Sequence, residues 1–313
     1  MCAKPIKDDT KTKVGTTGHS WDGIEELNNP LPRWWLWTFY LCILFAIGYT
    51  IAYPAWPLIS GATPGVLGAS TRADVAAEIQ HFDELNAPIK AKLVAADLTA
   101  IEGDEALRAY ALEAGKSLFA TNCAQCHGSG AAGVQGLGYP NLLDNDWLYG
   151  GAIDAIHATV THGVRNTVDP DARNVGIYMP AWSDKAVGAL ADMATAKLTT
   201  GEQIGEVVHY VLKISGQAAD EAKATAGAAI YTDNCVACHG EDGTGNRDLG
   251  APNLTDAIWL FGGDETTLTA TLMDGRGGVM PSWGYATAGS PARLSEADIR
   301  AVAVYVHSLG GGE

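Results

Sequence analysis

Two copies of a Cys-x-x-Cys-His motif occur in this 313-residue chain, at residues 123–127 and 235–239. Two thiols spaced in this way can each add to a vinyl group of a porphyrin, which attaches haem c covalently. The histidine that follows is then held under the iron as its proximal ligand. The motifs therefore predict two covalently bound haem c groups. Their attachment residues are Cys123, Cys126, Cys235 and Cys238, and their axial histidines are His127 and His239.

Three other interpretations of such a motif have to be weighed. A zinc site could take four Cys or His ligands from the two motifs together. A Cys-x-x-Cys pair could also be a redox-active dithiol or a disulfide, although a redox pair rarely has a histidine directly after it. The remaining cysteines, Cys2 and Cys42, belong to no motif, so cysteine usage does not indicate a disulfide framework. Repetition of the complete motif favours haem.

The sequence around the second motif repeats the sequence around the first at a constant offset of 112 residues. The repeated positions include Gly115, Phe119, Pro140, Asn141, Leu142, Asp144, Trp147 and Gly163, which recur as Gly227, Tyr231, Pro252, Asn253, Leu254, Asp256, Trp259 and Gly275. A Met-Pro-x-Trp segment recurs at an offset of 101, which places about 11 extra residues in the polar stretch 165–176 of the first copy. We therefore expect two tandem haem domains of the cytochrome c type, at 105–217 and 218–313.

Each haem needs a sixth iron ligand, and Met179 and Met280 are the candidates that share an equivalent context in both copies. A proline after the methionine stops a helix and fixes how the thioether approaches the ring. Thioether ligation opposite histidine is an electron-transfer arrangement. Spacing leaves open whether each methionine serves its own domain or whether the pairing is crossed. The less favoured candidates are Met193, Met273, His157, His162 and His209, and Arg165 and Arg276 are candidates for contacts to haem propionates.

Residues 34–53 carry no charge, and as a helix they would span roughly 30 Å, the thickness of a bilayer core. Aromatic residues crowd both ends of the run, as at membrane interfaces. A cleaved signal peptide would have a shorter apolar region and a shorter leader. Five Lys or Arg residues precede the run and one, Arg72, lies in the 20 residues after it. We therefore predict a transmembrane helix at 34–56, with the N-terminus cytoplasmic and the haem domains exported.

The chain is expected to be mainly α-helical. Residues 1–33 form the cytoplasmic segment: 1–20 read as a disordered tail, and 21–33 as a stretch that lies against a partner or the membrane. Residues 57–104 are expected to be a linker with helices, in which a helical segment from 71 is broken near Pro88. Further helices are predicted at 200–214 and 295–309, the second behind a capping box of Ser295 and Asp298.

The formal net charge of −16 lies entirely in residues 54–313, where 31 acidic residues face 15 basic ones. Such an acidic region argues against nucleic acid as a partner. It is compatible with electrostatic steering of a basic protein partner, and equally with a role in solubility alone.

The stretch WDGIEELNNPLPRWWLWTFY at residues 21–40 resembles the N-terminus of the cbb3-type cytochrome c oxidase subunit III family. The motifs that follow are similar in kind and order: NCAQCHG, PNLLDNDWLYGG, HGVR, YMPAW and a second haem domain. The resemblance implies a dihaem subunit of the bacterial inner membrane, with no catalytic centre of its own. It would take electrons from a donor cytochrome c and pass them to a mono-haem cytochrome c subunit and then to the haem–copper catalytic subunit. The family pattern implies Met179 and Met280 as axial ligands.

Three other functions would share part of this sequence. A free-standing, membrane-anchored dihaem cytochrome that shuttles electrons would have every haem residue but would not need the segment before the helix. A dihaem peroxidase needs one haem with an open sixth position, and two matching Met-Pro segments argue against it. A haem-based sensor usually carries a signalling domain, and none is visible.

Overall fold

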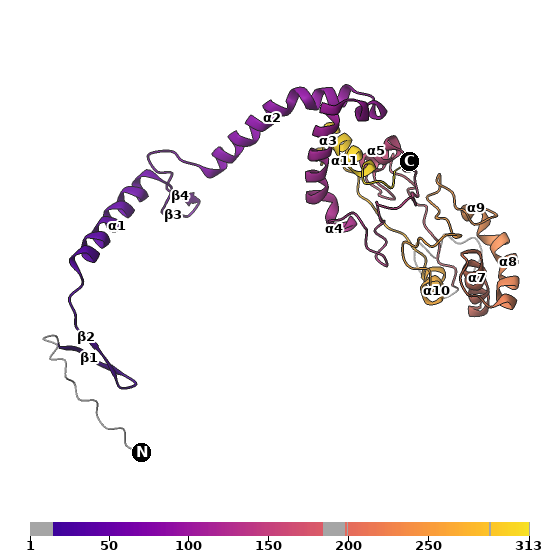
Figure 1. The fold of residues 1–313 in the computed structure, drawn as a ribbon, viewed down its shortest axis with the longest axis horizontal. Coiled ribbons are helices and arrows are strands. Elements are labelled where there is room, and N and C mark those ends of the chain that lie inside the picture. The colour runs from indigo at the N-terminus through magenta and orange to yellow at the C-terminus, as the bar shows by residue number, and fades with distance from the viewer. Residues whose placement is uncertain (1–14, 184–197, 199, 288, 313) are drawn as a thin grey trace, which may run out of the picture. The chain divides into compact units, whose positions relative to one another are not determined.

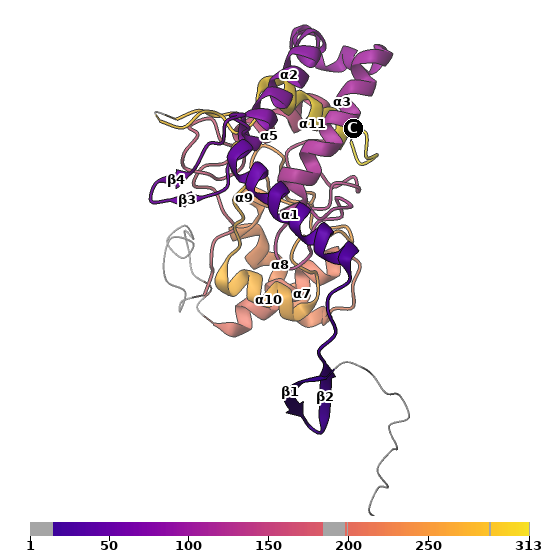
Figure 2. The same cartoon turned by 90° about the vertical axis from the view of Figure 1, so that its left-hand side faces the viewer.

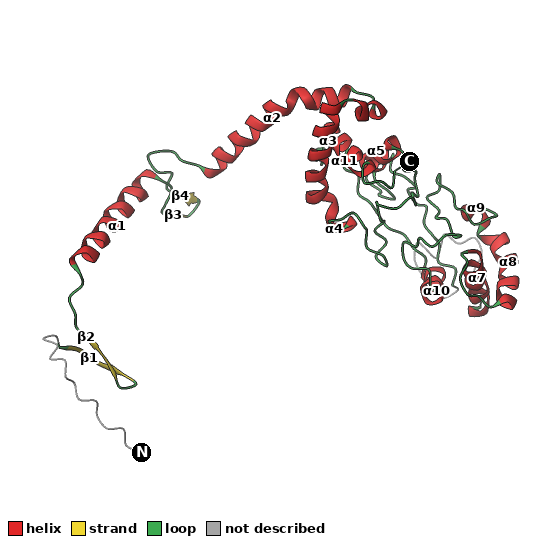
Figure 3. Ribbon diagram, viewed as in Figure 1, coloured by secondary structure: helices red, strands yellow, loops and turns green. Residues whose placement is uncertain are grey.

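The computed structural model describes residues 15–183, 198, 200–287 and 289–312. Helices make up most of the regular structure, and the strands form only two-stranded hairpins (Figure 3). This confirms the mainly α-helical prediction. Contacts divide the chain into one unit at 1–84 and a second at 85–313. Each unit is described by itself.

The first unit begins with a β-hairpin that was not anticipated. β1 (Thr16–Trp21) pairs antiparallel with β2 (Ile24–Leu27). Asp22 and Gly23 form the turn with φ values of 52° and 84°, the left-handed values of a type I′ turn. The prediction of a disordered tail over 1–20 is therefore wrong for the residues in β1, while residues 1–14 lie outside the described part.

Helix α1 (Arg33–Ala52) confirms the predicted apolar helix. It is long and apolar enough to cross a membrane, and none of its residues is buried by the rest of the chain. A short hairpin of β3 (Pro57–Leu58) and β4 (Gly61–Ala62) follows. Helix α2 (Thr71–Ala95) then runs through Pro88 without interruption, so the predicted break there is wrong. Its last turns bury Leu93 and pack Ile89 against neighbouring apolar residues, and that packing offsets the backbone hydrogen bond that Pro88 cannot make.

The second unit is built from short helices, most of which begin at an Asp, Ser or Thr whose side chain accepts a backbone N–H bond. Thr200 and Ser295 are two of these caps, and Ser295 forms the predicted capping box with Asp298. The elements are η1 (Leu98–Gly103), α3 (Glu105–Leu118), the π-helical turn η2 (Phe119–Cys123), α4 (Ala124–His127), α5 (Ile153–His162), α7 (Gly201–Ile214), α8 (Glu221–Asn234), α9 (Val236–His239), α10 (Glu265–Asp274) and α11 (Glu296–His307).

These helices surround two separate apolar cores, which we call the first and second core. In the first core, α3 and α5 pack with α11, the last helix of the chain. In the second core, α8 and α10 pack with α7. Both ribbon views place α11 beside α3 and α5, and place α7, α8 and α10 together (Figures 1 and 2). One helix of each core, α11 in the first and α7 in the second, therefore comes from the sequence segment assigned to the other haem domain. We call α11 and α7 the closing helices.

A repeated glycine marks each of these helix crossings. Gly115 of α3 faces the backbone of Ala301 in α11, and Gly227 of α8 faces the backbone of Glu206 in α7. At both glycines a Cβ atom would overlap the carbonyl group of the facing helix. The two glycines are equivalent under the 112-residue repeat. The domain boundaries at 105–217 and 218–313 stay a prediction, but the packing of α7 and α11 crosses them.

Candidate functional site: two haem-binding cores

The two Cys-x-x-Cys-His motifs occupy equivalent places in the two cores. Cys123 ends the turn η2, and Cys126 and His127 lie on α4. Cys235 lies between α8 and α9, as the cap of both, and α9 carries Cys238 and His239. Cys123 packs against the first core and Cys235 belongs to the second. Each short helix thus brings two sulfur atoms and one imidazole onto a single turn at the edge of a core.

A backbone carbonyl fixes the imidazole in both motifs. Nδ1 of His127 lies 3.1 Å from the carbonyl oxygen of Pro140, and Nδ1 of His239 lies 3.1 Å from that of Pro252. Because a carbonyl only accepts, Nδ1 must carry the proton, which leaves the lone pair of Nε2 free for a metal. Burial lowers the pKa of both imidazoles, against the opposing effect of the carbonyl, and so favours the neutral, ligating form. From the sequence alone, no role is assigned to Pro140 and Pro252, although their equivalent positions in the repeat indicate that they share one.

The cysteines do not have the properties of a redox pair, a disulfide or a zinc site. Burial is the main cause that raises the pKa of Cys123 to about 11, and the neighbouring Cys126 adds to it. Burial, and next Cys238, likewise raises the pKa of Cys235 to about 11. A reactive dithiol would need a lowered thiol pKa. All five cysteines within the described residues are free. The one cluster of His, Cys, Asp or Glu side chains there that is compact enough for a metal is His162 with Asp169 and Asp171, which includes no cysteine.

Each Met-Pro segment is held by a pair of backbone hydrogen bonds to the other copy of the repeat. Met280 exchanges N–H···O bonds of 3.0 and 2.9 Å with Val164, directly after α5. Met179 exchanges two bonds of 3.0 Å with Arg276, directly after α10. We call each pair of backbone hydrogen bonds, Val164 with Met280 and Arg276 with Met179, a clamp. Val164 and Arg276 are equivalent positions in the repeat, so the same clamp is formed twice.

Glycines before the clamps allow the close approach. Gly163 has a φ of 71°, and a Cβ there would overlap the backbone of Met280 and Pro281. Gly275 has a φ of 73° and would meet Met179 in the same way. Met280 consequently packs with the first core and Met179 with the second. The structure thus brings Met280 to the core of Cys123 and His127, and Met179 to the core of Cys235 and His239.

The other candidate ligands have different surroundings. His157 pairs with Glu296 at 3.0 Å, and His162 with Asp169 at 3.0 Å. His209 is buried, and its Nδ1 accepts a bond from the backbone N–H of Asp220. Met273, on α10, is 38 % exposed and belongs to neither core. Met193 lies outside the described residues.

The two candidate propionate arginines, Arg165 and Arg276, are held in place by neighbouring groups. Arg165 donates from Nε to the carbonyl oxygen of Ile177 at 2.7 Å and lies over the ring of Tyr178. Arg276 donates from Nε to Thr271 Oγ1 and lies over the ring of Phe261. Contact with a propionate stays a prediction for both side chains.

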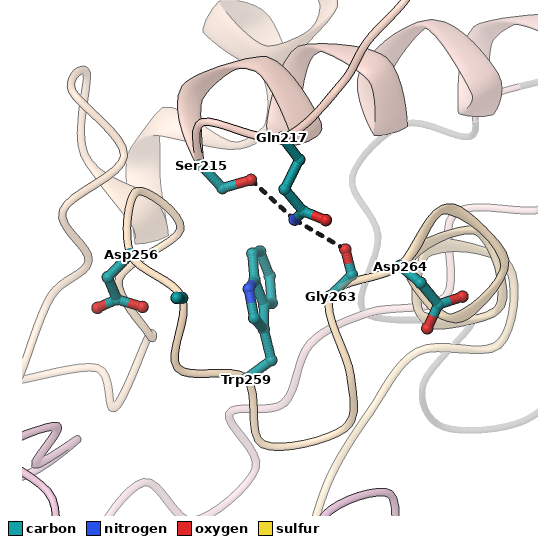
Figure 4. A pocket seen from close by; sticks show the side chains of 7 residues that line it. Ser215, Gln217, Asp256, Trp259, Gly263 and Asp264 are labelled. Carbon is teal, nitrogen blue, oxygen red and sulfur yellow. Dashed lines mark hydrogen bonds between the residues drawn. The ribbon is translucent and has the colours of Figure 1, made fainter.

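Equivalent tryptophans lie at the ends of the two closing helices. The indole N–H of Trp147 donates to the backbone of Gly311, just after α11. Trp259 faces the end of α7 and stands in a cleft of about 330 Å³, where Gln217 donates to Ser215 Oγ and to the carbonyl of Gly263, both at 3.0 Å (Figure 4). No predicted haem ligand lines this cleft.

Taken together, each core offers two thiols, an imidazole with a free Nε2, and a methionine whose backbone is fixed by two hydrogen bonds. This donor set fits a covalently attached haem with His and Met as axial ligands. It occurs twice with the same geometry, as the repeat predicts.

Comparison with known proteins agrees with these features. A family described as the N-terminal domain of cytochrome oxidase-cbb3, FixP, matches residues 13–60, and the cytochrome c family matches residues 112–215 and 224–310. The CcoP subunit of the cbb3-type cytochrome c oxidase of Cereibacter sphaeroides is 59% identical over 100% of both chains. Rhodobacter capsulatus CcoP is 58% identical over the same extent. The FixP subunit of Azorhizobium caulinodans is 48% identical over 95% of this chain and 94% of that protein. The chain therefore belongs to the CcoP/FixP family of cbb3-type cytochrome c oxidase subunits.

Proposed function

We propose that this chain is the dihaem electron-transfer subunit of a cbb3-type cytochrome c oxidase. It accepts electrons from a donor cytochrome c and passes them towards the mono-haem subunit and the haem–copper centre that reduces oxygen. The observation that carries the proposal is the pair of equivalent donor sets, each with a clamped methionine, in a chain that matches oxidase subunits along its whole length.

Haem, when bound, supplies a one-electron couple at its iron. The residues of the chain determine how that couple is held. Cys123 and Cys126 attach one group and Cys235 and Cys238 the other. Pro140 and Pro252 hold the imidazoles of His127 and His239 in the tautomer that can ligate. Both cores also contain a methionine that could take the sixth position of a bound haem, which favours an electron-transfer role over a peroxidase.

The clamps support a crossed assignment of the axial methionines. Met280 would complete the site of His127, and Met179 the site of His239. Own-domain pairing would require each Met-Pro segment to leave the strand-like bonds that it makes in the other core. Each haem site would then depend on the segment that follows the other haem motif.

Helix α1 would anchor the subunit in the bacterial inner membrane, with the N-terminus cytoplasmic and residues 57–313 on the periplasmic side. Five basic residues before the helix and one shortly after it support this orientation. The hairpin of β1 and β2 would then lie on the cytoplasmic side, away from the haems.

Purification of the complex in mild detergent tests this function. An affinity-tagged chain should co-elute with the other oxidase subunits and carry two haems that survive denaturation. Its reduced haems should be reoxidised by oxygen in the complex but not in the isolated chain. Elution of the chain alone, with full oxidase turnover in its absence, would support a free-standing electron shuttle instead.

A further inference from the structure

The first half of helix α2, which belongs to the unit at 1–84, carries a row of exposed apolar side chains. Val75, Ile79 and Phe82 follow one another at spacings of four and three residues, so they lie on one face of the helix. Their exposed fractions are 58, 58 and 52 %. We call these three residues the α2 stripe. The apolar contacts of α2 with the first core are made further along, by Ile89 and Leu93, and none of the three stripe residues belongs to either core.

The charges around the stripe limit what can cover it. Between residues 71 and 85 the helix has four acidic residues, Asp74, Glu78, Asp83 and Glu84, and one basic residue, Arg72. Helices that lie on a membrane surface have lysine and arginine on their polar face, because lipid headgroups are anionic. An acidic helix is therefore poorly suited to lipid. Two copies of the same helix would also bring like charges together across a shared apolar face.

We infer that the α2 stripe docks into an apolar groove, rimmed by lysine or arginine, on another subunit of the oxidase. This inference rests on the proposed function. An amphipathic helix that lays apolar residues into a groove is a common recognition mode, with anchors at the spacing seen here. Glu78 and Asp83 lie next to the stripe in sequence and would face the basic rim.

The test compares two triple variants of the full chain, each co-expressed with the remaining oxidase subunits. Val75→Gln, Ile79→Gln and Phe82→Gln together remove the stripe. Ala73→Gln, Ala77→Gln and Glu84→Gln change the same number of exposed residues on other faces of the helix. We expect the stripe variant to keep both haems and to bind the complex roughly tenfold or more weakly, because truncating buried apolar anchors has effects of this size. The control variant should co-purify like the wild type.

Charge reversal and hydrogen exchange provide the second readout. Glu78→Lys with Asp83→Lys should weaken co-purification at low salt, and the deficit should shrink as salt screens the new repulsion. Amide exchange over 75–82 should be slow in the complex and fast in the isolated chain in lipid nanodiscs. Co-purification of the stripe variant at wild-type levels would overturn the inference, as would protection by lipid alone or by self-association. Failure of the wild-type chain to co-purify would instead refute the proposed function.

Discussion

The exchange of closing helices between the two cores predicts where a core substitution will act. Val302 lies on α11 and is 1 % exposed in the first core, and Val208 lies on α7 and is 0 % exposed in the second. Replacing either by alanine removes two buried carbon atoms, worth about 0.8 kcal/mol each, and leaves a small cavity. We therefore expect each change to lower, by about 2 kcal/mol, the free energy needed to open the core that contains it. Amide hydrogens that exchange from the opened state should then exchange roughly thirtyfold faster.

Hydrogen exchange measured peptide by peptide distinguishes exchanged packing of the closing helices from own-domain packing. Val302→Ala should accelerate exchange in α3 and α5, which precede it by more than 130 residues, and leave α8 unchanged. Val208→Ala should accelerate exchange in α8 and α10 and leave α3 unchanged. The two substitutions serve as controls for each other, because they are identical in chemistry and burial. Acceleration of α8 by Val302→Ala, with α3 unaffected, would refute the exchanged packing.

Two further predictions concern charge. Electron entry from a basic donor cytochrome should slow as ionic strength rises, since the −16 net charge lies outside the first 53 residues; stopped-flow rates independent of salt would assign that charge to solubility alone. Burial, and then Asp256 and Asp144, raise the pKa of Asp146 from 3.8 to about 6. The folded state therefore binds the proton more tightly than the unfolded state, and stability falls as pH rises from about 4 to about 6. Asp146→Asn should raise the melting temperature at pH 7 and change it little near pH 4; equal shifts at both values would contradict this.

Several parts of the structure follow from local signals in the sequence. The uncharged run gives α1, Ser295 and Asp298 give the start of α11, and Thr200 gives the start of α7. The 112-residue repeat anticipates that Pro140 and Pro252 occupy equivalent places, although their hydrogen bonds to the imidazoles become visible only in the structure. The apolar helix and the two helix caps depend on a few neighbouring residues, which is why the sequence alone is sufficient to predict them.

The exchange between the cores could not be derived from the repeat. Both copies carry the same Met-Pro segment and the same glycine at the clamp, so own-domain and crossed packing satisfy the same local patterns. The choice depends on contacts between residues far apart in sequence, such as Val164 with Met280 and Met179 with Arg276. In the first core, chain-closure entropy alone would favour own-domain closure by α7, which lies closer to α3 in sequence than α11 does. Packing of the complete unit has to outweigh that preference.

Two errors came from applying a local rule without its context. Pro88 was expected to end a helix, but the turns after it are fixed by Ile89 and Leu93 in the first core. The polar composition of residues 1–20 suggested disorder, although the Asp22-Gly23 pair beside β-forming residues is a signal for a hairpin turn. That signal was present in the sequence and was missed.

The most direct test of the account is to determine which methionine controls which haem. In a chain with Cys123→Ala and Cys126→Ala, only the haem of Cys235 and Cys238 remains. Spectroelectrochemical titration of that chain should show a potential lowered on the order of 0.1 V by Met179→His, because imidazole replaces the thioether that raises it. Met280→His should leave the potential unchanged. A lowered potential with Met280→His and none with Met179→His would contradict the crossed assignment and restore own-domain ligation.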